Sequence, residues 1–258
     1  MIETILKPIA ADLEYTNDLL KKEFTYIDIR TGKFSVLEPL FRMTSLRPAL
    51  VILASRIFGG NIEKTAILAT VVQYLFYASM VHDTITCDEP HPVIKGSGQM
   101  TGDRFYILMG DYFHSRAAVI LQGAGIKGVA RTLADIVCQM QEARIQMRTI
   151  TAHNSGVPAS HDIIRKESAE LIAGCCLLGA RLAGASEREQ ENLASYGRNL
   201  GIALRLSERD DSQKQVADYL NKAREALLYI PPQPERAILE QLADAVTDSR
   251  TRARRLVG

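Results

Sequence analysis

The sequence predicts an all-α protein, a single domain over residues 1–258 in which antiparallel helices pack as a bundle. Two observations carry this prediction. No stretch alternates apolar and polar residues as a half-buried strand does, and no short repeat of the solenoid type occurs. Apolar residues instead recur at helical spacing in long segments, and proline or glycine separates these segments.

The predicted helices have recognisable ends. Pro8 and Pro48 fall in the first turns of two of them, where the missing N–H costs no hydrogen bond. Residues 25–32 are a predicted break, residues 90–102 are a loop rich in Pro, Gly and Ser, and residues 231–234 form a rigid proline turn. In order, helices are expected over residues 3–24, 34–40, 48–60, 62–86, 103–122, 127–151, 162–183, 186–207 and 213–229, and a last helix carries Ile238, Leu242, Ala245 and Val246 on one face.

The centre of the bundle is expected to be the helix over residues 62–86, packed with the helices over 103–122 and 162–183. Its apolar run contains no helix breaker and then delivers His82 and Asp83 side by side. A carboxylate at the end of a buried helix suits Mg²⁺, which prefers oxygen ligands. The alternative is an ordinary solvated helix end, with His82 as a hydrogen-bonded core histidine.

Composition excludes several classes of protein. The 31 basic and 30 acidic residues give a net charge of +1, so nothing predicts a nucleic-acid partner. No uninterrupted run of about 20 apolar residues occurs, and the N-terminus lacks a signal-peptide pattern, so we expect a cytoplasmic chain without a transmembrane segment. The four cysteines form no metal-binding spacing, and the adjacent pair Cys175-Cys176 is expected to pack in the core.

Five segments in a fixed order resemble the trans-isoprenyl (polyprenyl) diphosphate synthase family. They are Leu46-Arg47-Pro48-Ala49-Leu50, Phe58-Gly59-Gly60, the stretch over residues 82–89, Gly110-Asp111-Tyr112-Phe113, and the helix over residues 196–203. The resemblance implies a helix bundle around a central cavity, isoprenoid diphosphates as ligands and Mg²⁺ as cofactor. It also implies association through core helices, as a homodimer or as a hetero-oligomer with a homologous chain.

The first aspartate-rich motif of that family, His-Asp-Asp-x-x-Asp, is incomplete here. Asp83 matches the leading aspartate, but Thr84 and Cys87 stand at the other two positions. Asp88 lies five residues after Asp83, about 140° around a helix, so it reaches the same metal only if the helix ends first. Asp83 and Asp88 are therefore the candidate metal ligands of this motif.

The second aspartate-rich motif is also eroded. In the register set by residues 196–203, Glu208, Arg209 and Ser212 occupy the three aspartate positions. A shift of two residues makes Asp210 and Asp211 the candidate metal ligands but places Lys214 at the third position. In either register a cation stands where a ligand should be, and a fixed positive charge opposes Mg²⁺ binding. The alternative is a solvated polar helix end.

The diphosphate clamp implied by the resemblance is partial. Arg47 matches the family's arginine, and the alternative for it is a structural ion pair. Glu167 and Ser168 stand where Lys-Thr is usual, and Lys166 is displaced by one residue, about 100° around the helix. Lys166 is a candidate clamp or a solvated lysine, and Glu167 would repel a diphosphate.

The wall of the product tunnel is the remaining part of the site. Ala78 and Ser79 precede Asp83 by about one turn, and in the family small residues there leave room for a long product. Close helix packing is the alternative. Tyr74 is a candidate for the tunnel or for the core, and Glu142 and Gln146 are predicted to share a helix face that points into the cavity.

Three functions follow from this pattern. The first is a non-catalytic or regulatory subunit of a long-chain prenyl diphosphate synthase, paired with a catalytic homologue. The second is an active prenyltransferase that condenses an allylic diphosphate with isopentenyl diphosphate at a remodelled Mg²⁺ site. The third is an isoprenoid-binding protein without chemistry. Loss of most metal-ligand aspartates favours the first.

Overall fold

The computed structural model describes residues 2–31, 46–83, 85, 103–152, 161–208 and 213–247. These residues form helices and short turns and contain no strand, so the all-α prediction is confirmed. The helices are α1 (Ile2–Ile5), η1 (Lys7–Ile9), α2 (Ala10–Thr31), α3 (Leu46–Arg56), α4 (Ile62–Asp83), α5 (Asp103–Gly123), α6 (Ala130–Ala152), α7 (His161–Ile164), η4 (Arg165–Ala169), α8 (Glu170–Leu182), α9 (Glu187–Glu208), α10 (Gln213–Leu227) and α11 (Pro234–Thr247).

The N-terminal segment differs from the prediction in two places. The 3₁₀ turn η1 surrounds Pro8, which separates the short α1 from α2. The break expected from residue 25 is wrong, because α2 continues to Thr31. Thr25 lies within this helix, and its hydroxyl donates to the carbonyl of Lys21, one turn earlier, at 2.9 Å.

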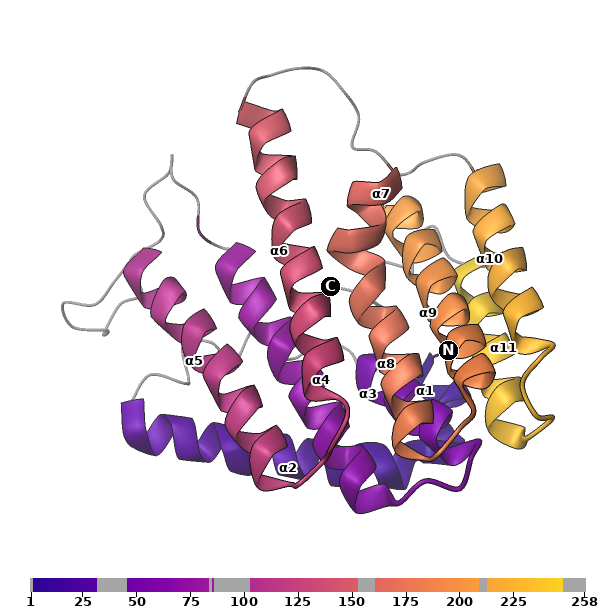
Figure 1. Ribbon diagram of the computed structural model, residues 1–258, viewed down its shortest axis with the longest axis horizontal. Helices are drawn as coiled ribbons and strands as arrows, with labels where there is room; N and C mark the ends of the chain where they lie inside the picture. The colour runs from indigo at the N-terminus through magenta and orange to yellow at the C-terminus, as the bar shows by residue number, and fades with distance from the viewer. Residues whose placement is uncertain are drawn as a thin grey trace.

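Helix α4 is the centre of the bundle. It lies against α2, α3, α5 and α8, while α8 also packs on α3 and α9 (Figure 1). Gly179 allows α8 to approach α3, since a Cβ there would lie 2.4 Å from the Val51 carbonyl oxygen. The result is a core that draws buried apolar side chains from nearly every helix, from η1 to α11.

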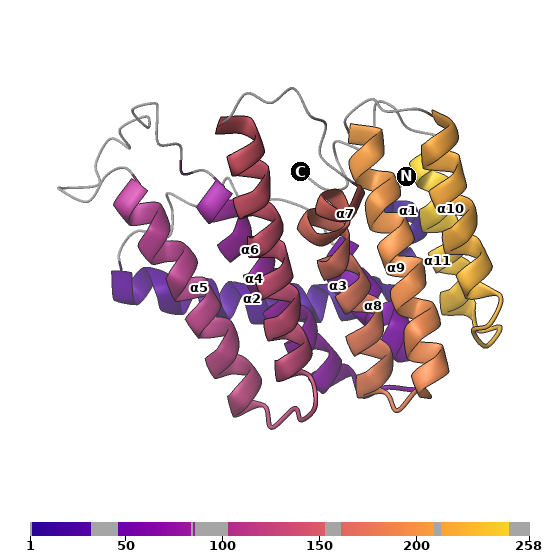
Figure 2. The ribbon, with the colours of Figure 1, turned by 45° about the horizontal axis from the view of Figure 1, so that its top comes forward.

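Helices α5 and α6 flank one side of α4. Figures 1 and 2 show α4 between and behind them, while α2 runs across the bundle. Between α4, α5 and α6 lies an apolar groove of about 600 Å³, whose walls include Val71, Leu75, Leu121, Leu133 and Val137. This side therefore presents apolar surface that no helix of the described part of the chain fills.

By length and composition α4 could cross a membrane, although its sequence contains no uninterrupted run of about 20 apolar residues. In this fold, however, 83% of its most apolar 18-residue window is buried inside the bundle. Helix α4 is therefore apolar on all sides because other helices surround it.

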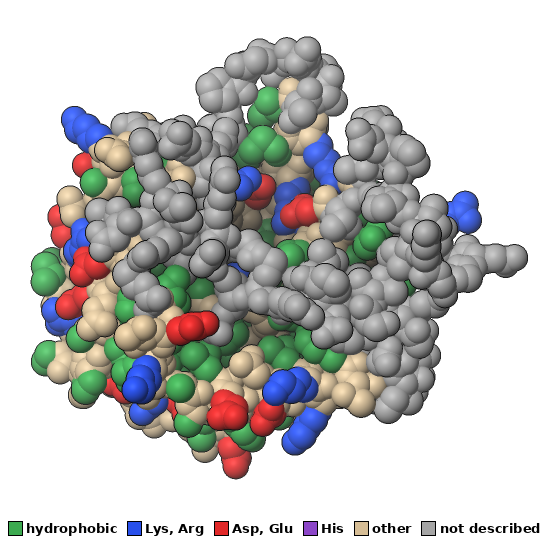
Figure 3. Space-filling model, turned by 180° about the vertical axis from the view of Figure 1, so that it is seen from behind, with side chains coloured by type: hydrophobic (Ala, Val, Ile, Leu, Met, Phe, Trp, Pro, Cys, Tyr) green, Lys and Arg blue, Asp and Glu red, His purple; other side chains and the backbone are tan. Residues whose placement is uncertain are grey.

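The face opposite to that of Figure 1 carries charges of both signs. Among its visible described side chains, Lys and Arg alternate with Asp and Glu, and hydrophobic side chains lie between them (Figure 3). A nucleic-acid interface requires a basic stripe, and the visible described part of this face has none.

Candidate functional site

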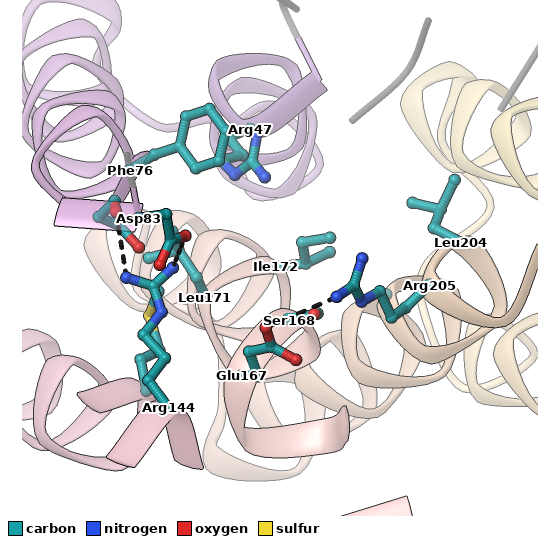
Figure 4. Close-up of a pocket in the computed structure, with 13 residues that line it drawn as sticks. Arg47, Phe76, Asp83, Arg144, Glu167, Ser168, Leu171, Ile172, Leu204 and Arg205 are labelled. Atoms are coloured by element: carbon teal, nitrogen blue, oxygen red, sulfur yellow. Dashed lines mark hydrogen bonds and ion pairs between the residues drawn. The ribbon is translucent and has the colours of Figure 1, made fainter. Parts of the chain in front are cut away.

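A cavity of about 150 Å³ opens between α3, α4, α6, η4, α8 and α9, at the end of α4 where the first motif begins. Three arginines, two carboxylates and a set of apolar side chains surround it (Figure 4). Its lining residues are Arg47, Phe76, Ser79, Asp83, Met140, Arg144, Glu167, Ser168, Leu171, Ile172, Gly201, Leu204 and Arg205.

Asp83 forms an ion pair with Arg144. It is the last residue of α4, and Arg144 Nη2 donates to its Oδ2 at 2.7 Å, while Nη1 donates to the carbonyl of Ser79 at 3.1 Å. The Arg144 side chain is 15% exposed and that of Asp83 is 52% exposed. A cation at the C-terminus of α4 is also favourable because it is attracted to the negative end of the helix dipole, whereas a lone carboxylate there would be repelled.

Burial acts on both members of this pair. It lowers the pKa of Arg144, although the carboxylates of Asp83 and Glu167 oppose the shift. Burial also raises the pKa of Asp83, and the charge of Arg144 acts in the opposite direction. Arg144 stays charged, and its guanidinium favours the ionised form of Asp83.

Glu167 and Arg205 form the second ion pair of the cavity. Arg205 Nη2 lies 3.6 Å from Glu167 Oε1, and both side chains are largely buried. Glu167 belongs to η4, a π-helical turn that widens the start of the helix continued by α8. The repulsion predicted between Glu167 and a diphosphate is therefore offset by the guanidinium beside it.

Arg47 is the third arginine of the cavity and is only 5% exposed. Its Cζ lies 3.3 Å from the centre of the Phe76 ring, so a cation–π contact fixes the plane of the guanidinium. Figure 4 shows the guanidinium groups of Arg47 and Arg205 directed into the space between α3, α8 and α9.

Lys166 does not belong to this cluster. Its Nζ lies 3.2 Å from Asp162, one turn earlier, and its side chain is absent from the cavity lining. Glu167, the next residue along the π turn, takes the inward position in this structure, and the role of Lys166 in a diphosphate clamp stays a prediction. The candidate metal ligands Asp88, Asp210 and Asp211 lie outside the described residues.

The three candidate tunnel residues lie in different surroundings. Ser79 lines the cavity. Tyr74 is fully buried between Phe24 and Phe113, with ring centres 6.0 and 5.5 Å away, and Ala78 is fully buried as well. Neither Tyr74 nor Ala78 lines the cavity. Their part in setting product length stays a prediction.

His82 lies on the other side of the α4 end and faces α5. Its Nε2 is 3.5 Å from Asp111 and 3.4 Å from the carbonyl of Ile107. A Cβ at position 110 would lie 2.1 Å from the same nitrogen, so Gly110 is required for His82 to fit. The Gly-Asp segment of α5 and His82 are thus one structural unit, outside the cavity.

Arg144 and Arg205 are the cavity-lining arginines that sequence reasoning missed. Glu142 and Gln146, predicted to face the cavity, are exposed, and Arg144 takes that face. The available signal was the spacing from Met140: Met140 is buried on the core face of α6, and Arg144 follows it by one turn.

Mg²⁺ does not fit the described residues. No three His, Cys, Asp or Glu side chains within the described ranges cluster as metal ligands do. Asp83 forms an ion pair with Arg144, and Glu167 forms one with Arg205. Each carboxylate therefore faces a guanidinium group and not another carboxylate that could share a metal ion. A metal at Asp83 would have to displace Arg144 into a partly buried site without its counter-ion.

Comparison with known proteins identifies the family. The model of the polyprenyl synthetase family matches residues 44–220, which is more than half of the chain. The chain belongs to the polyprenyl synthetase family. The match includes the cavity lining from Arg47 to Arg205.

Individual polyprenyl synthetases show how far the likeness extends. The octaprenyl diphosphate synthase of Escherichia coli is 24% identical over 70% of this chain and 59% of its own length. Component 2 of the heptaprenyl diphosphate synthase of Geobacillus stearothermophilus is 27% identical over 63% of this chain and 52% of its own. The matched part thus spans between half and two thirds of these relatives.

Solved structures agree on the fold. A polyprenyl synthase from Caulobacter crescentus, in complex with calcium and isoprenyl diphosphate, superposes with a TM-score of 0.80. The likeness covers 97% of this chain and 98% of that one at 19% identity. The polyprenyl synthetase fold is therefore shared over nearly the whole chain.

Proposed function

We propose that this chain is a non-catalytic or regulatory subunit of a prenyl diphosphate synthase of the long-chain type, paired with a catalytic homologue. One observation carries the proposal: Arg144 forms an ion pair with Asp83, the leading carboxylate of the first motif. A carboxylate that neutralises a protein cation is a poor ligand for the metal that the reaction needs.

The size of the cavity supports the same proposal. Its volume of about 150 Å³ is smaller than the ~300–1,000 Å³ of typical small-molecule sites. An allylic diphosphate and isopentenyl diphosphate would have to occupy the working site together. The cavity bounded by the described residues is smaller than a typical small-molecule site.

The surface of α5 and α6 supports a partner. The apolar groove of about 600 Å³ has walls on both helices. Each helix also carries an exposed large apolar side chain, since Val119 of α5 is 56% exposed and Ile145 of α6 is 66% exposed. Large exposed apolar surface is typical of protein interfaces. The relative from Geobacillus stearothermophilus is itself named as a component of a synthase, which is consistent with a partner chain.

The proposal is tested by co-purifying the chain with a full-motif homologue from the same cell. Product from radiolabelled isopentenyl diphosphate and farnesyl diphosphate in Mg²⁺ is then measured for each chain and for the pair. We expect no product from this chain alone and a changed yield or chain length when it accompanies the homologue. Product from this chain alone would instead establish the remodelled active site, and no effect in either arrangement would leave only a binding role.

A matched pair of variants locates the interface. Val119→Asp places a negative charge on the α5–α6 face. Leu228→Asp places the same charge at the end of α10, on a leucine that is 67% exposed. We expect Val119→Asp alone to abolish the effect on the homologue. Equal effects of the two variants would contradict the assignment of the interface to α5 and α6.

A further inference from the structure

Helix α10 carries a line of polar side chains on its outer face. Asp218, Lys222, Glu225 and Tyr229 follow one another at intervals of four, three and four residues, and all of them are exposed. Tyr229 belongs to the turn directly after α10 and extends the line. Spacings that alternate between three and four residues keep side chains on one face of a helix, as in the seam of a coiled coil. We call these residues the α10 stripe.

The charges of the α10 stripe are not used within the described part of the chain. No ion pair joins Asp218, Lys222 or Glu225 to another described residue. Arg224 of the same helix, by contrast, faces the bundle and pairs with Asp244 of α11 at 2.7 Å. The three charged groups of the stripe are therefore available to a second molecule.

The α10 stripe is complementary to a copy of itself. Two α10 helices can pack antiparallel about a two-fold axis that passes midway between Lys222 and Glu225. Lys222 of one copy then faces Glu225 of the other, and Asp218 faces Tyr229. Each contact occurs twice, because a two-fold axis brings the same surface of both copies together. An ammonium group attracts a carboxylate, and a tyrosine hydroxyl can donate to one, so all four contacts are favourable.

We propose that α10 is a self-association surface, through which two copies of this chain pair antiparallel about a two-fold axis. Charge complementarity carries the proposal, since an exposed line of alternating charges fits its own reverse and would repel a surface with a different order of charges. A groove of about 410 Å³ between α9 and α10 adjoins the stripe and has Lys222, Glu225 and Tyr229 among its lining residues. Side chains of the second copy therefore have room between the two helices.

Self-association through α10 leaves the α5–α6 face accessible. Figures 1 and 2 show α5 near one edge of the bundle and α10 near the opposite edge. A copy that is joined at α10 can therefore still bind the catalytic homologue through α5 and α6. Two such pairs then form an assembly of four chains, and this last step alone rests on the proposed function.

Sedimentation equilibrium of the full-length chain tests the contact. All samples carry Val119→Asp, so that the α5–α6 face is charged in each of them. Lys222→Glu, or Glu225→Lys, places like charges opposite each other in two contacts, so the dissociation constant should rise at least about tenfold and the mass should fall toward half. Lys64→Glu is the matched control, because it makes the same charge change on an exposed lysine of α4, and it should leave the mass unchanged.

A mixture of the two single variants tests the antiparallel register. Lys222→Glu in one copy faces Glu225→Lys in the other, so both contacts are attractive again and the mixture should recover the mass of the parent. The double variant should recover it as well. Circular dichroism verifies that each variant is folded. A mixture that stays as light as its components, or a control that dissociates as readily as Lys222→Glu, would overturn the proposal.

The same variants separate this proposal from the proposed function. The mass of this chain alone decides the contact at α10, whereas the product assay with the homologue decides the role of the α5–α6 face. If Lys222→Glu released the homologue and left the mass of this chain alone unchanged, the α10 stripe would bind the homologue and self-association would be refuted.

Discussion

Removal of Asp83 from the Asp83–Arg144 ion pair should change the free energy of unfolding. The direction of this change distinguishes a structural ion pair from a metal site. We expect Asp83→Ala to destabilise the fold by about 2 kcal/mol, because it leaves a guanidinium that is only 15% exposed without its carboxylate. Arg144→Met should cost about 1 kcal/mol, since the carboxylate left behind is 52% exposed and water can solvate it. The loss of stability is thus larger in the variant that leaves the more buried partner, Arg144, without its counter-ion.

Thermal and urea unfolding measure these differences. For a domain of this size about 1 kcal/mol corresponds to ~2–4 °C, so the melting temperature should fall by about 4–8 °C in Asp83→Ala. A double-mutant cycle should give a coupling energy of about 1 kcal/mol between the two residues. Asp135→Ala is the matched control, because its partner Arg131 on the same helix is 95% exposed, and it should change stability by less than about 0.5 kcal/mol.

An increase in stability in Asp83→Ala would refute this reasoning. Carboxylates kept for metal binding are held at a cost to the fold, and their removal often stabilises it. Asp83 would then act as a metal ligand, and its contact with Arg144 would contribute little to the fold.

Three further changes test other parts of the structure. Gly110→Ala should destabilise the chain by about 2 kcal/mol in urea unfolding, because the new Cβ would lie 2.1 Å from the His82 ring; an unchanged midpoint would show that His82 moves freely. Glu170→Gln should cost about 3 kcal/mol, because the buried carboxylate is bonded to two arginines, and a loss below 1 kcal/mol would contradict that role. Burial and the neighbouring His82 lower the pKa of His114 below 6.5, so the free energy of unfolding should fall as the pH drops below about 6.5, where the unfolded chain binds more protons. In His114→Gln this slope should flatten, and an equal slope in both proteins would exclude His114 as its source.

Most of the fold follows from periodicity and helix ends. The apolar run of α4, the proline of α3 and the glycines after it predict elements that the structure confirms within a few residues. The break expected from Thr25 is wrong because α2 continues to Thr31. Low helix propensity at single residues is too weak a signal to end a helix.

The site was less predictable. Asp83 and Arg47 were identified through motif positions, and both line the cavity. Arg144 was missed because an arginine on an amphipathic helix usually lies in solvent, and the packing of α6 on η4 and α8 places it beside the cavity. The inward position of Glu167 in place of Lys166 was not predictable either, because a π turn changes the angle between successive residues and sequence spacing assumes a regular α-helix.

The most direct test of the central claim is the turnover of isopentenyl diphosphate and farnesyl diphosphate by the purified chain alone, measured over a titration of Mg²⁺. Because Arg144 already neutralises Asp83, we expect no product at any Mg²⁺ concentration. Product that rises and saturates with Mg²⁺, and that Asp83→Ala abolishes, would contradict the account and establish a working metal site.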